Sequence, residues 1–397
     1  LLTLGVFSCA VARVEGTPPP RAASGTYYVA ATGSDTNPGT RAAPFRTIQR
    51  AADLVKAGDV VIVEDGTYTD HDRDGAVLRV RRGGTPTERV VFRAASRWGA
   101  KLDGEHGATA NGVDFDAGSG YVRIEGFEIT GFGNVGTPRG SASGIDLYDG
   151  GHHSEIVGNH IHDIGRVCTH SRNTNGQVGV FVQQPGVLIE GNVIHDIGRF
   201  FPGENGCSYT PGFRGYQSLD HGIYLNGQEP GADNTMIRNN VFYNTRHGWA
   251  VQWYPGSLSN VHVVNNTFAF GNPNKNYTSI VLDASISASS IVNNIFYNPE
   301  GGRTIEAAGF SGTITIAHNI TMGSAITDRH MPPPGMELLN NQLATDARLM
   351  NPEEFDFRLK AQSPAIDAGR TLSAVARDID GRARPRGAKH DIGAIEY

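Results

Sequence analysis

The sequence predicts an all-β fold, a solenoid of stacked single-stranded coils known as a parallel β-helix. The first observation is a unit that occurs twice between His221 and Phe268, as HGIYLNG with NTMIRNNVFYN and then as HGWAVQWYPG with NVHVVNNTFAFG. The second is that the Asn-bearing strand recurs with a shortest spacing of about 25 residues. The third is that the segments between strands are rich in Gly, Asn, Asp and Pro and show no helical period. Repeats of this kind fit a β-helix better than a leucine-rich or helical repeat.

The Asn of each coil forms a column that we interpret as scaffold without a catalytic role. Its members are Asn159, Asn192, Asn240, Asn266, Asn294 and Asn319, with Phe127 at the same place one coil earlier. We expect each Asn to adopt left-handed backbone at a corner and to bond its amide to the next coil.

The sequence divides into three predicted parts. Residues 1–24 are a signal-peptide remnant and spacer, residues 25–345 are the β-helix with its N-terminal cap, and residues 346–397 are a C-terminal capping segment. The run LLTLGVFSCAVA before Arg13 predicts the tail of a secretory signal with Ala10-Val11-Ala12 as its cleavage site, too short to span a bilayer, and hence a secreted or cell-surface protein. Lipidation of Cys9 is the less favoured alternative. The segment PFRTIQRAADLVKAGD predicts a short amphipathic helix that covers the first coil, and residues 346–397 are expected to hide the last one.

Alternation with period two divides the first strand of each coil into two faces. The residues expected in the core are Ile145, Leu147, Val180, Val182, Ile223, Leu225, Val251, Ile280 and Leu282. Those expected outside are Asp146, Tyr148, Phe181, Gln183, Tyr224, Asn226, Gln252, Asp283 and Glu306.

Charge and cysteine content limit the partners and the compartment. A net charge of −6 and a pI near 6.2 provide no basic field for nucleic acid or anionic membranes. We expect a monomer. Cys168 and Cys207 follow the two copies of HDIGR, so a disulfide between the insertions is predicted, with two free buried thiols as the alternative.

The segments YYVAATGSDTNPGT and PFRTIQRAADLVKAGDVVIVEDGTY, followed by stacked NxF coils, resemble the right-handed parallel β-helix proteins of the pectate-lyase-like superfamily. The N-terminal part is most similar to family nine pectate lyases and to the alginate and chondroitin B lyases. The resemblance implies a right-handed coil and β-elimination of an acidic, uronic-acid-containing polysaccharide. Related lyases often use Ca²⁺, which makes that ion a possible cofactor.

A groove beside the insertions 166–178 and 199–219 is the predicted site. We expect His221 or His247 as base, Tyr224 as acid, Arg246 or Arg214 with Gln252 as carboxylate neutralisers, and Lys275 as the second candidate base. The residues expected to bind substrate are Asp146, Tyr148, Gln183, Arg214, Asp220, Asn226, Trp249, Gln252 and Trp253. The alternative for the two His is that they bond corner carbonyls.

Other functions remain open on the same scaffold. A glycoside hydrolase would use paired carboxylates from Asp146, Asp220 and Asp283. A uronate C5-epimerase would share the proton abstraction, with Asp220-His221 as an acid–His pair. A carbohydrate-binding surface protein would use the groove without catalysis.

Two motifs suggest metal binding and are given structural interpretations instead. DHDRDG has the acidic spacing of a calcium loop, with Asp70, Asp72 and Asp74 as candidate ligands, but Arg81 takes the place of the final acid. A solvated acidic turn is therefore favoured. His162-Asp163 and His195-Asp196 repeat one coil apart, which predicts a stacked hydrogen-bonded ladder rather than a metal site.

Overall fold

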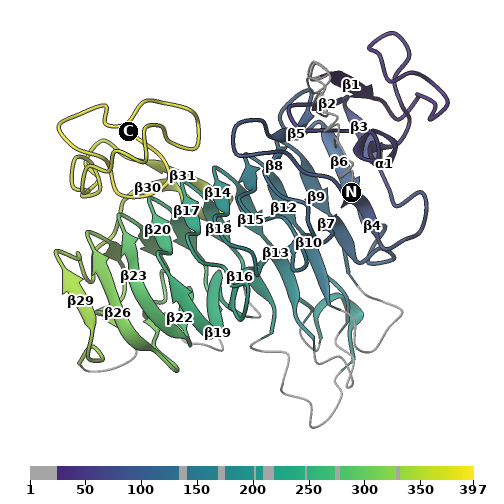
Figure 1. Ribbon diagram of the computed structural model, residues 1–397. Coiled ribbons are helices and arrows are strands. Elements are labelled where there is room, and N and C mark those ends of the chain that lie inside the picture. Colours follow the sequence, from purple (N-terminus) through teal and green to yellow (C-terminus); the bar gives the residue numbers. More distant parts are fainter. Residues whose placement is uncertain are drawn as a thin grey trace, which may run out of the picture.

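The computed structural model describes residues 25–133, 141–168, 175–200, 203–208, 219–245, 248–272, 278–327 and 331–397. The predicted signal segment 1–24 lies outside these residues. Within them the chain winds as a parallel β-helix whose coils contribute strands to three walls (Figure 1). The predicted fold class is confirmed.

Strands of successive coils pair in parallel along each wall. The first wall contains β4 (Ala76–Val80), β7 (Asn111–Phe115), β10 (Ala142–Leu147), β13 (Gln177–Val182), β16 (His221–Gly227), β19 (Val251–Ser259), β22 (Ile280–Leu282), β25 (Arg303–Glu306) and β28 (Ala325–Thr327). The second contains β1 (Thr26–Val29), β2 (Val60–Val63), β5 (Val90–Ala94), β8 (Val122–Glu125), β11 (Glu155–Val157), β14 (Leu188–Glu190), β17 (Met236–Arg238), β20 (His262–Val264), β23 (Ser285–Val292), β26 (Ser311–Ala317) and β29 (Met336–Leu339). The third contains β3 (Gly66–Tyr68), β6 (Ala100–Asp103), β9 (Glu128–Thr130), β12 (His160–His162), β15 (Val193–His195), β18 (Val241–Tyr243), β21 (Thr267–Ala269), β24 (Ile295–Tyr297) and β27 (Ile320–Thr321).

The core is one continuous column inside the walls. All nine residues predicted to point inward are fully buried. Phe242, Phe268 and Phe296 stack through the core of the third wall with ring centroids 4.8 and 4.9 Å apart. Because each coil buries its apolar side chains against the coils above and below, the period-two pattern alone is enough to define the core.

The Asn column forms a ladder between the second and third walls, as predicted. Asn240 Nδ2 donates to Asn266 Oδ1 at 3.0 Å and to the carbonyl of Ile189 at 2.9 Å. The ladder continues one rung further than predicted, to Asn341. The expected left-handed backbone belongs instead to the residue before each rung, such as Asn239 (φ 54°). That residue makes the corner, which leaves the ladder Asn free to point inward.

The N-terminal end is covered by the predicted helix, α1 (Ile48–Ala52). Thr47 caps it by accepting the backbone N–H of Arg50 at 3.1 Å. Ile48, Ala51 and Ala52 join the solenoid core. Figure 1 shows α1 at one end of the solenoid and β29 at the other.

The C-terminal segment packs along the flank of the solenoid rather than over its last coil. Its hairpin of β30 (Leu349–Asn351) and β31 (Asp356–Leu359) is followed by irregular chain to Tyr397. Leu349, Phe357 and Ile392 of this segment pack against Tyr243 and Ile295 of the third wall. The expectation that it hides the last coil is wrong. Its apolar residues pack instead against apolar side chains on the outer face of the third wall.

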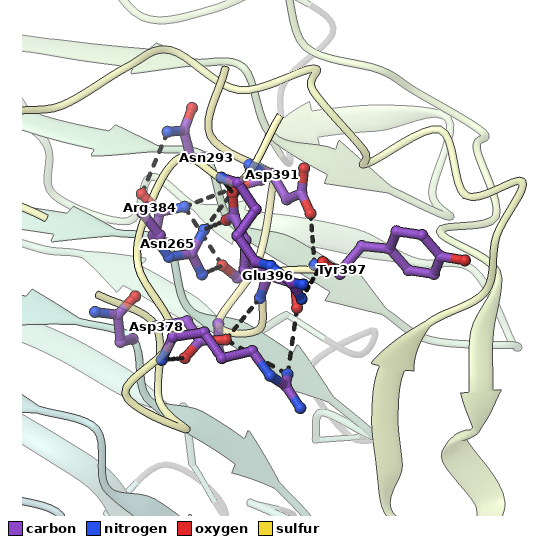
Figure 2. A network of polar contacts seen from close by, with 12 residues as sticks. Asn265, Asn293, Asp378, Arg384, Asp391, Glu396 and Tyr397 are labelled. Atoms are coloured by element: carbon purple, nitrogen blue, oxygen red, sulfur yellow. Dashed lines mark hydrogen bonds and ion pairs between the residues drawn. The ribbon is translucent and has the colours of Figure 1, made fainter. Parts of the chain in front are cut away.

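A buried polar network fastens the end of this segment (Figure 2). Arg384 Nη1 bonds Glu396 Oε2 at 2.7 Å and donates to the carbonyl of Asp391 at 3.0 Å. Asn265, from the ladder corner, donates to the same carbonyl at 2.9 Å. The segment is therefore tied to the coils by both apolar contacts and hydrogen bonds.

None of the helices in the described part of the chain has the length and apolar character needed to cross a membrane.

Candidate active site

A cleft of about 550 Å³ lies on the outer face of the first wall, where the site was predicted. Its lining consists of Asn111, Asp114, Ser141, Ser143, Asp146, Tyr148, Asp149, Asn175, Gly176, Val178, Phe181, Leu219, His221, Tyr224, Gln252 and Tyr254. These residues come from five adjacent strands, β7 to β19, and from the turns at both ends of those strands. The cleft therefore runs along the solenoid across several coils.

Strand register aligns the functional side chains into a row. The paired positions on successive strands are Asp114, Asp146, Phe181, Tyr224 and Gln252. A second row holds Asn111, Ser143, Val178 and His221. Because paired strands lie about 4.8 Å apart, residues up to 141 positions apart in the chain share one small surface.

Asp146 sits at the centre of the cleft in an environment that favours its neutral form. Its carboxyl accepts the Ser143 hydroxyl at 3.1 Å and the Tyr148 N–H at 3.0 Å. Burial raises the pKa of Asp146 from 3.8 to about 7, and the charge of Asp114 adds to the rise. At neutral pH much of the Asp146 population therefore carries a proton that it can donate.

Asp114 is the neighbour of Asp146 on β7 and, unlike Asp146, contacts an arginine. Asp114 Oδ2 accepts from Arg79 Nη1 at 2.8 Å and from Asn111 Nδ2 at 3.4 Å. Burial raises the pKa of Asp114, and Arg79 opposes that rise. We refer to Asp114 and Asp146 as the carboxyl pair.

His221 lines the floor of the cleft as a neutral hydrogen-bond donor. Its Nδ1 accepts the backbone N–H of Trp249 at 3.3 Å, so the neutral ring carries its proton on Nε2. Burial lowers the pKa of His221 from 6.5 to about 3, while the charge of Asp220 opposes this shift and that of Arg199 adds to it. The neutrality expected of this ring thus arises mainly from burial. In this tautomer the ring donates a proton, which argues against the predicted role as base.

Aromatic rings form one side of the cleft. Phe181 and Tyr224 stack with centroids 5.0 Å apart, and Tyr148, 53% exposed, lies 5.8 Å from Phe181. Burial raises the pKa of Tyr224 to about 12, so its phenol stays protonated at neutral pH. Such a row suits the apolar faces of sugar rings.

Gln252 has an unused acceptor at the edge of the cleft. Its side chain is mostly buried, and its Oε1 has no hydrogen-bond partner among the described residues. Because an unpaired buried acceptor is costly, this oxygen is suited to a donor supplied by a ligand.

Two predicted binding residues do not face the cleft. Asp220 is fully buried and accepts from Arg199 Nη2 at 2.6 Å and Nε at 3.0 Å, so it serves as the internal counter-ion of that arginine. Trp253 is fully buried in the core. Alternation along β19 places Val251 and Trp253 inside and Gln252 and Tyr254 outside.

Three other predicted residues border the first wall but do not line the cleft. Gln183 donates to the carbonyl of Glu229, and Asn226 accepts the N–H of Gln228, so both hold the turn beyond β16. Trp249 stacks behind His221 with centroids 5.7 Å apart. The hydrolase candidate Asp283 also lies outside the cleft lining. The predicted Arg214, Arg246, His247 and Lys275 fall outside the described residues.

The main residue that sequence reasoning missed is Asp114. Its strand reads GVDF and the next reads GIDL, so aligning those two strands would have paired Asp114 with Asp146. The longer, less regular coil between them hid the match.

The predicted disulfide is present. Cys168 and Cys207 are bonded with a Cα–Cα distance of 5.3 Å. The bridge joins the two insertions that connect the third wall to the first.

The acidic turn at 70–75 does not present a calcium cage. Asp74 Oδ2 bonds Arg79 Nε at 2.9 Å and Arg81 Nη2 at 3.0 Å, and Asp70 accepts the N–H groups of Asp74 and Gly75. No group of three or more acidic, His or Cys side chains within the described ranges is arranged to hold a metal ion. Since the carboxylates of Asp70 and Asp74 are committed to protein donors, only Asp72 would remain as an acidic ligand, and the turn does not fit Ca²⁺.

The repeated His-Asp pairs form the predicted ladder on the third wall. The rings of His162 and His195 stack with centroids 4.9 Å apart and an interplanar angle of 1°. Asp163 bonds His162 Nδ1 at 2.7 Å, and Asp196 bonds His195 Nδ1 at 2.6 Å.

Comparison with known proteins confirms the resemblance predicted from the sequence. Residues 27–179 match the family model described as Pel9A-like, right handed beta helix region. The chain is 30% identical over 148 residues to the uncharacterized protein YwoF of Bacillus subtilis, and 33% identical over 86 residues to the pectate lyase PEL9 of Emericella nidulans. These alignments cover 36% and 22% of this chain but only 30% and 20% of the two relatives.

Solved structures show the same fold over most of the chain. The crystal structure of pectate lyase Pel9A superposes with a TM-score of 0.60 at 15% identity, covering 94% of this chain and 97% of that one. A rhamnogalacturonan lyase superposes with a TM-score of 0.55 at 14% identity, covering 86% and 96%. The right-handed parallel β-helix is thereby established as the fold.

Proposed function

We propose that this protein is a secreted polysaccharide lyase that cleaves a uronic-acid-containing chain by β-elimination in the cleft of the first wall. The observation that carries the proposal is that three groups able to donate a proton near neutral pH, Asp146, the Tyr224 phenol and Nε2–H of His221, line one cleft. The pectate lyases among the similar proteins support the choice of reaction.

β-Elimination needs the substrate carboxylate neutralised before the proton at C5 becomes acidic enough to remove. Neutral donors can do this by hydrogen bonding, as a carboxylic acid kept protonated by its site does. Asp146 and His221 Nε2–H are placed for that role. Tyr224 then protonates the leaving oxygen at C4. His247 and Lys275 are the proposed bases.

Glycoside hydrolysis is the second candidate, and the carboxyl pair favours it. Two Asp on neighbouring strands, of which only Asp114 contacts an arginine, match the acid and the nucleophile of a retaining glycosidase. In that reaction Asp146 protonates the glycosidic oxygen.

Product analysis separates these reactions. The full chain is incubated with polygalacturonate, alginate, a glycosaminoglycan and a neutral xylan, with and without chelator. A lyase yields ultraviolet-absorbing unsaturated ends, whereas a hydrolase yields reducing ends without that absorbance. A C5-epimerase changes uronate configuration without shortening the chain. Binding without any of these changes would overturn the enzymatic proposal and leave a carbohydrate-binding protein.

A further inference from the structure

Arg79 of β4 lies next to the carboxyl pair, on the side of Asp114. Arg79 pairs in register with Asp114, which pairs in turn with Asp146. Arg79 therefore lies one strand before Asp114 in the first wall. It is not part of the cleft lining.

Arg79 is held in place from several sides. Its Nε bonds Asp74 Oδ2 at 2.9 Å, and its Nη2 donates to the Asp74 carbonyl at 3.0 Å. Its Nη1 reaches both Asp114 Oδ2 at 2.8 Å and Asp116 Oδ1 at 3.2 Å. The acidic turn that resembles a calcium loop thus anchors an arginine.

The capping helix fixes the backbone of the same residue. Gln49 Oε1 accepts the Arg79 N–H at 2.8 Å, and Gln49 Nε2 donates to the Arg79 carbonyl at 3.2 Å. Gln49 Nε2 also contacts Asp53 Oδ1 at 2.9 Å. Helix α1 and the turn at 70–75 therefore set the position of one guanidinium.

The two carboxyls differ chiefly in this contact. Asp114 faces a cation, whereas the described partners of Asp146 are a hydroxyl and a backbone N–H. When two adjacent carboxyls share one proton, the one beside the cation is stabilised as the anion and the other keeps the proton. The anion on Asp114 then opposes ionisation of Asp146 by like-charge repulsion.

We propose that Arg79 is a positioning residue that assigns the shared proton to Asp146, although it touches no substrate. This inference rests on the proposed function for its catalytic meaning and deepens it. It explains why the turn and the helix converge on a residue outside the cleft. The same assignment serves a lyase or a hydrolase, since both use the Asp146 proton.

The test is ¹³C NMR of the Asp carboxyl carbons in the folded full chain, titrated between about pH 4 and about pH 9. Asp114→Asn and Asp146→Asn assign the two signals. In the wild type we expect Asp114, beside Arg79, to ionise at lower pH than Asp146, whose pKa is about 7. In Arg79→Gln we expect Asp114 to hold at least half of the shared proton and Asp146 to ionise at lower pH.

Arg81→Gln is the matched control. Arg81 pairs with Asp53 and Asp74 at 3.0 Å and with Asp116 at 3.7 Å in the same network, but no contact with Asp114 is observed for it. Its replacement is expected to leave the proton on Asp146. Arg79→Lys keeps a charge but loses the fork that reaches Asp74 and Asp114 together, so a smaller shift is expected and the inference stays testable if Arg79→Gln does not fold.

A proton that stays on Asp146 in both Arg79 variants, or one that resides on Asp114 in the wild type, overturns the inference. Because the titration needs no substrate, its outcome is independent of whether any glycan is cleaved. For an active enzyme, Arg79→Gln is expected to lower kcat about tenfold or more with KM changed less than about threefold, because a smaller fraction of Asp146 then carries the proton it must donate.

Discussion

Asp114 and Asp146 occupy paired register positions on neighbouring parallel strands, yet an arginine contact is observed only for Asp114. The contact with this one arginine makes the two carboxyls chemically distinct. Three consequences of this difference can be measured directly, and a fourth prediction concerns the Asn ladder.

Replacement of Asp146 by Asn should remove the cleavage activity while preserving the fold. Asn keeps the shape and an acceptor oxygen but has no acidic proton, so we expect a loss of about 10²- to 10⁴-fold in kcat. Initial rates on the best substrate measure it. Asp103→Asn on the third wall is the control and should be fully active. A variant at Asp146 that retains more than a tenth of the rate would contradict the assignment.

The activity should fall as pH rises above about 7, because the ionised form of Asp146 no longer donates a proton. His221 should contribute no acid limb near 6.5, since burial lowers its pKa to about 3. A pH profile of kcat tests both statements. An alkaline limb that persists unchanged in Asp114→Asn would be inconsistent with the coupling between the two carboxyls.

The same carboxyl should make the protein less stable at alkaline pH. The folded-state pKa of Asp146, about 7, lies above its ordinary value of 3.8. Its contribution is therefore fully present below pH 3.8 and is lost as pH rises through about 7, at a cost of up to about 4 kcal/mol. Denaturant unfolding at about pH 5 and about pH 8.5 should show that Asp146→Asn gains stability relative to wild type mainly at the higher pH. An equal gain at both values would refute this.

The Asn ladder should be costly to interrupt in the middle and cheap to interrupt at its end. In Asn240→Ala, the backbone N–H and the side-chain amide of Asn192 both lose the oxygen they share at 2.9 Å. Leaving these two buried donors without an acceptor should lower the free energy of unfolding by about 3 kcal/mol or more. Asn341→Ala, at the partly exposed end rung, should cost about 1 kcal/mol because water can replace the lost acceptor. Urea unfolding measures the free energy of unfolding of the two variants. An equal decrease in both would contradict the prediction that the buried rungs of the ladder stabilise the fold more than the end rung.

Much of the fold follows from the sequence alone. Period-two alternation and a repeated corner Asn identify the strands, the core and the ladder, because each coil meets nearly the same environment as the next. The HDIG repeat predicted its stacked rings, and the two insertions predicted their disulfide, for the same reason. A local sequence pattern is enough to predict a contact when the partner of a residue is the equivalent residue of the next coil.

The site depended on tertiary structure. His221 and Asp220 are neighbours in sequence, but the coil leaves the imidazole at the cleft floor and gives the carboxylate to Arg199. Asp146 owes its raised pKa first to burial and then to Asp114, 32 residues earlier, and Asp114 in turn contacts Arg79, another 35 residues back. Protonation is decided by burial and by the nearest charges in space, and a one-dimensional pattern does not record which coil supplies them.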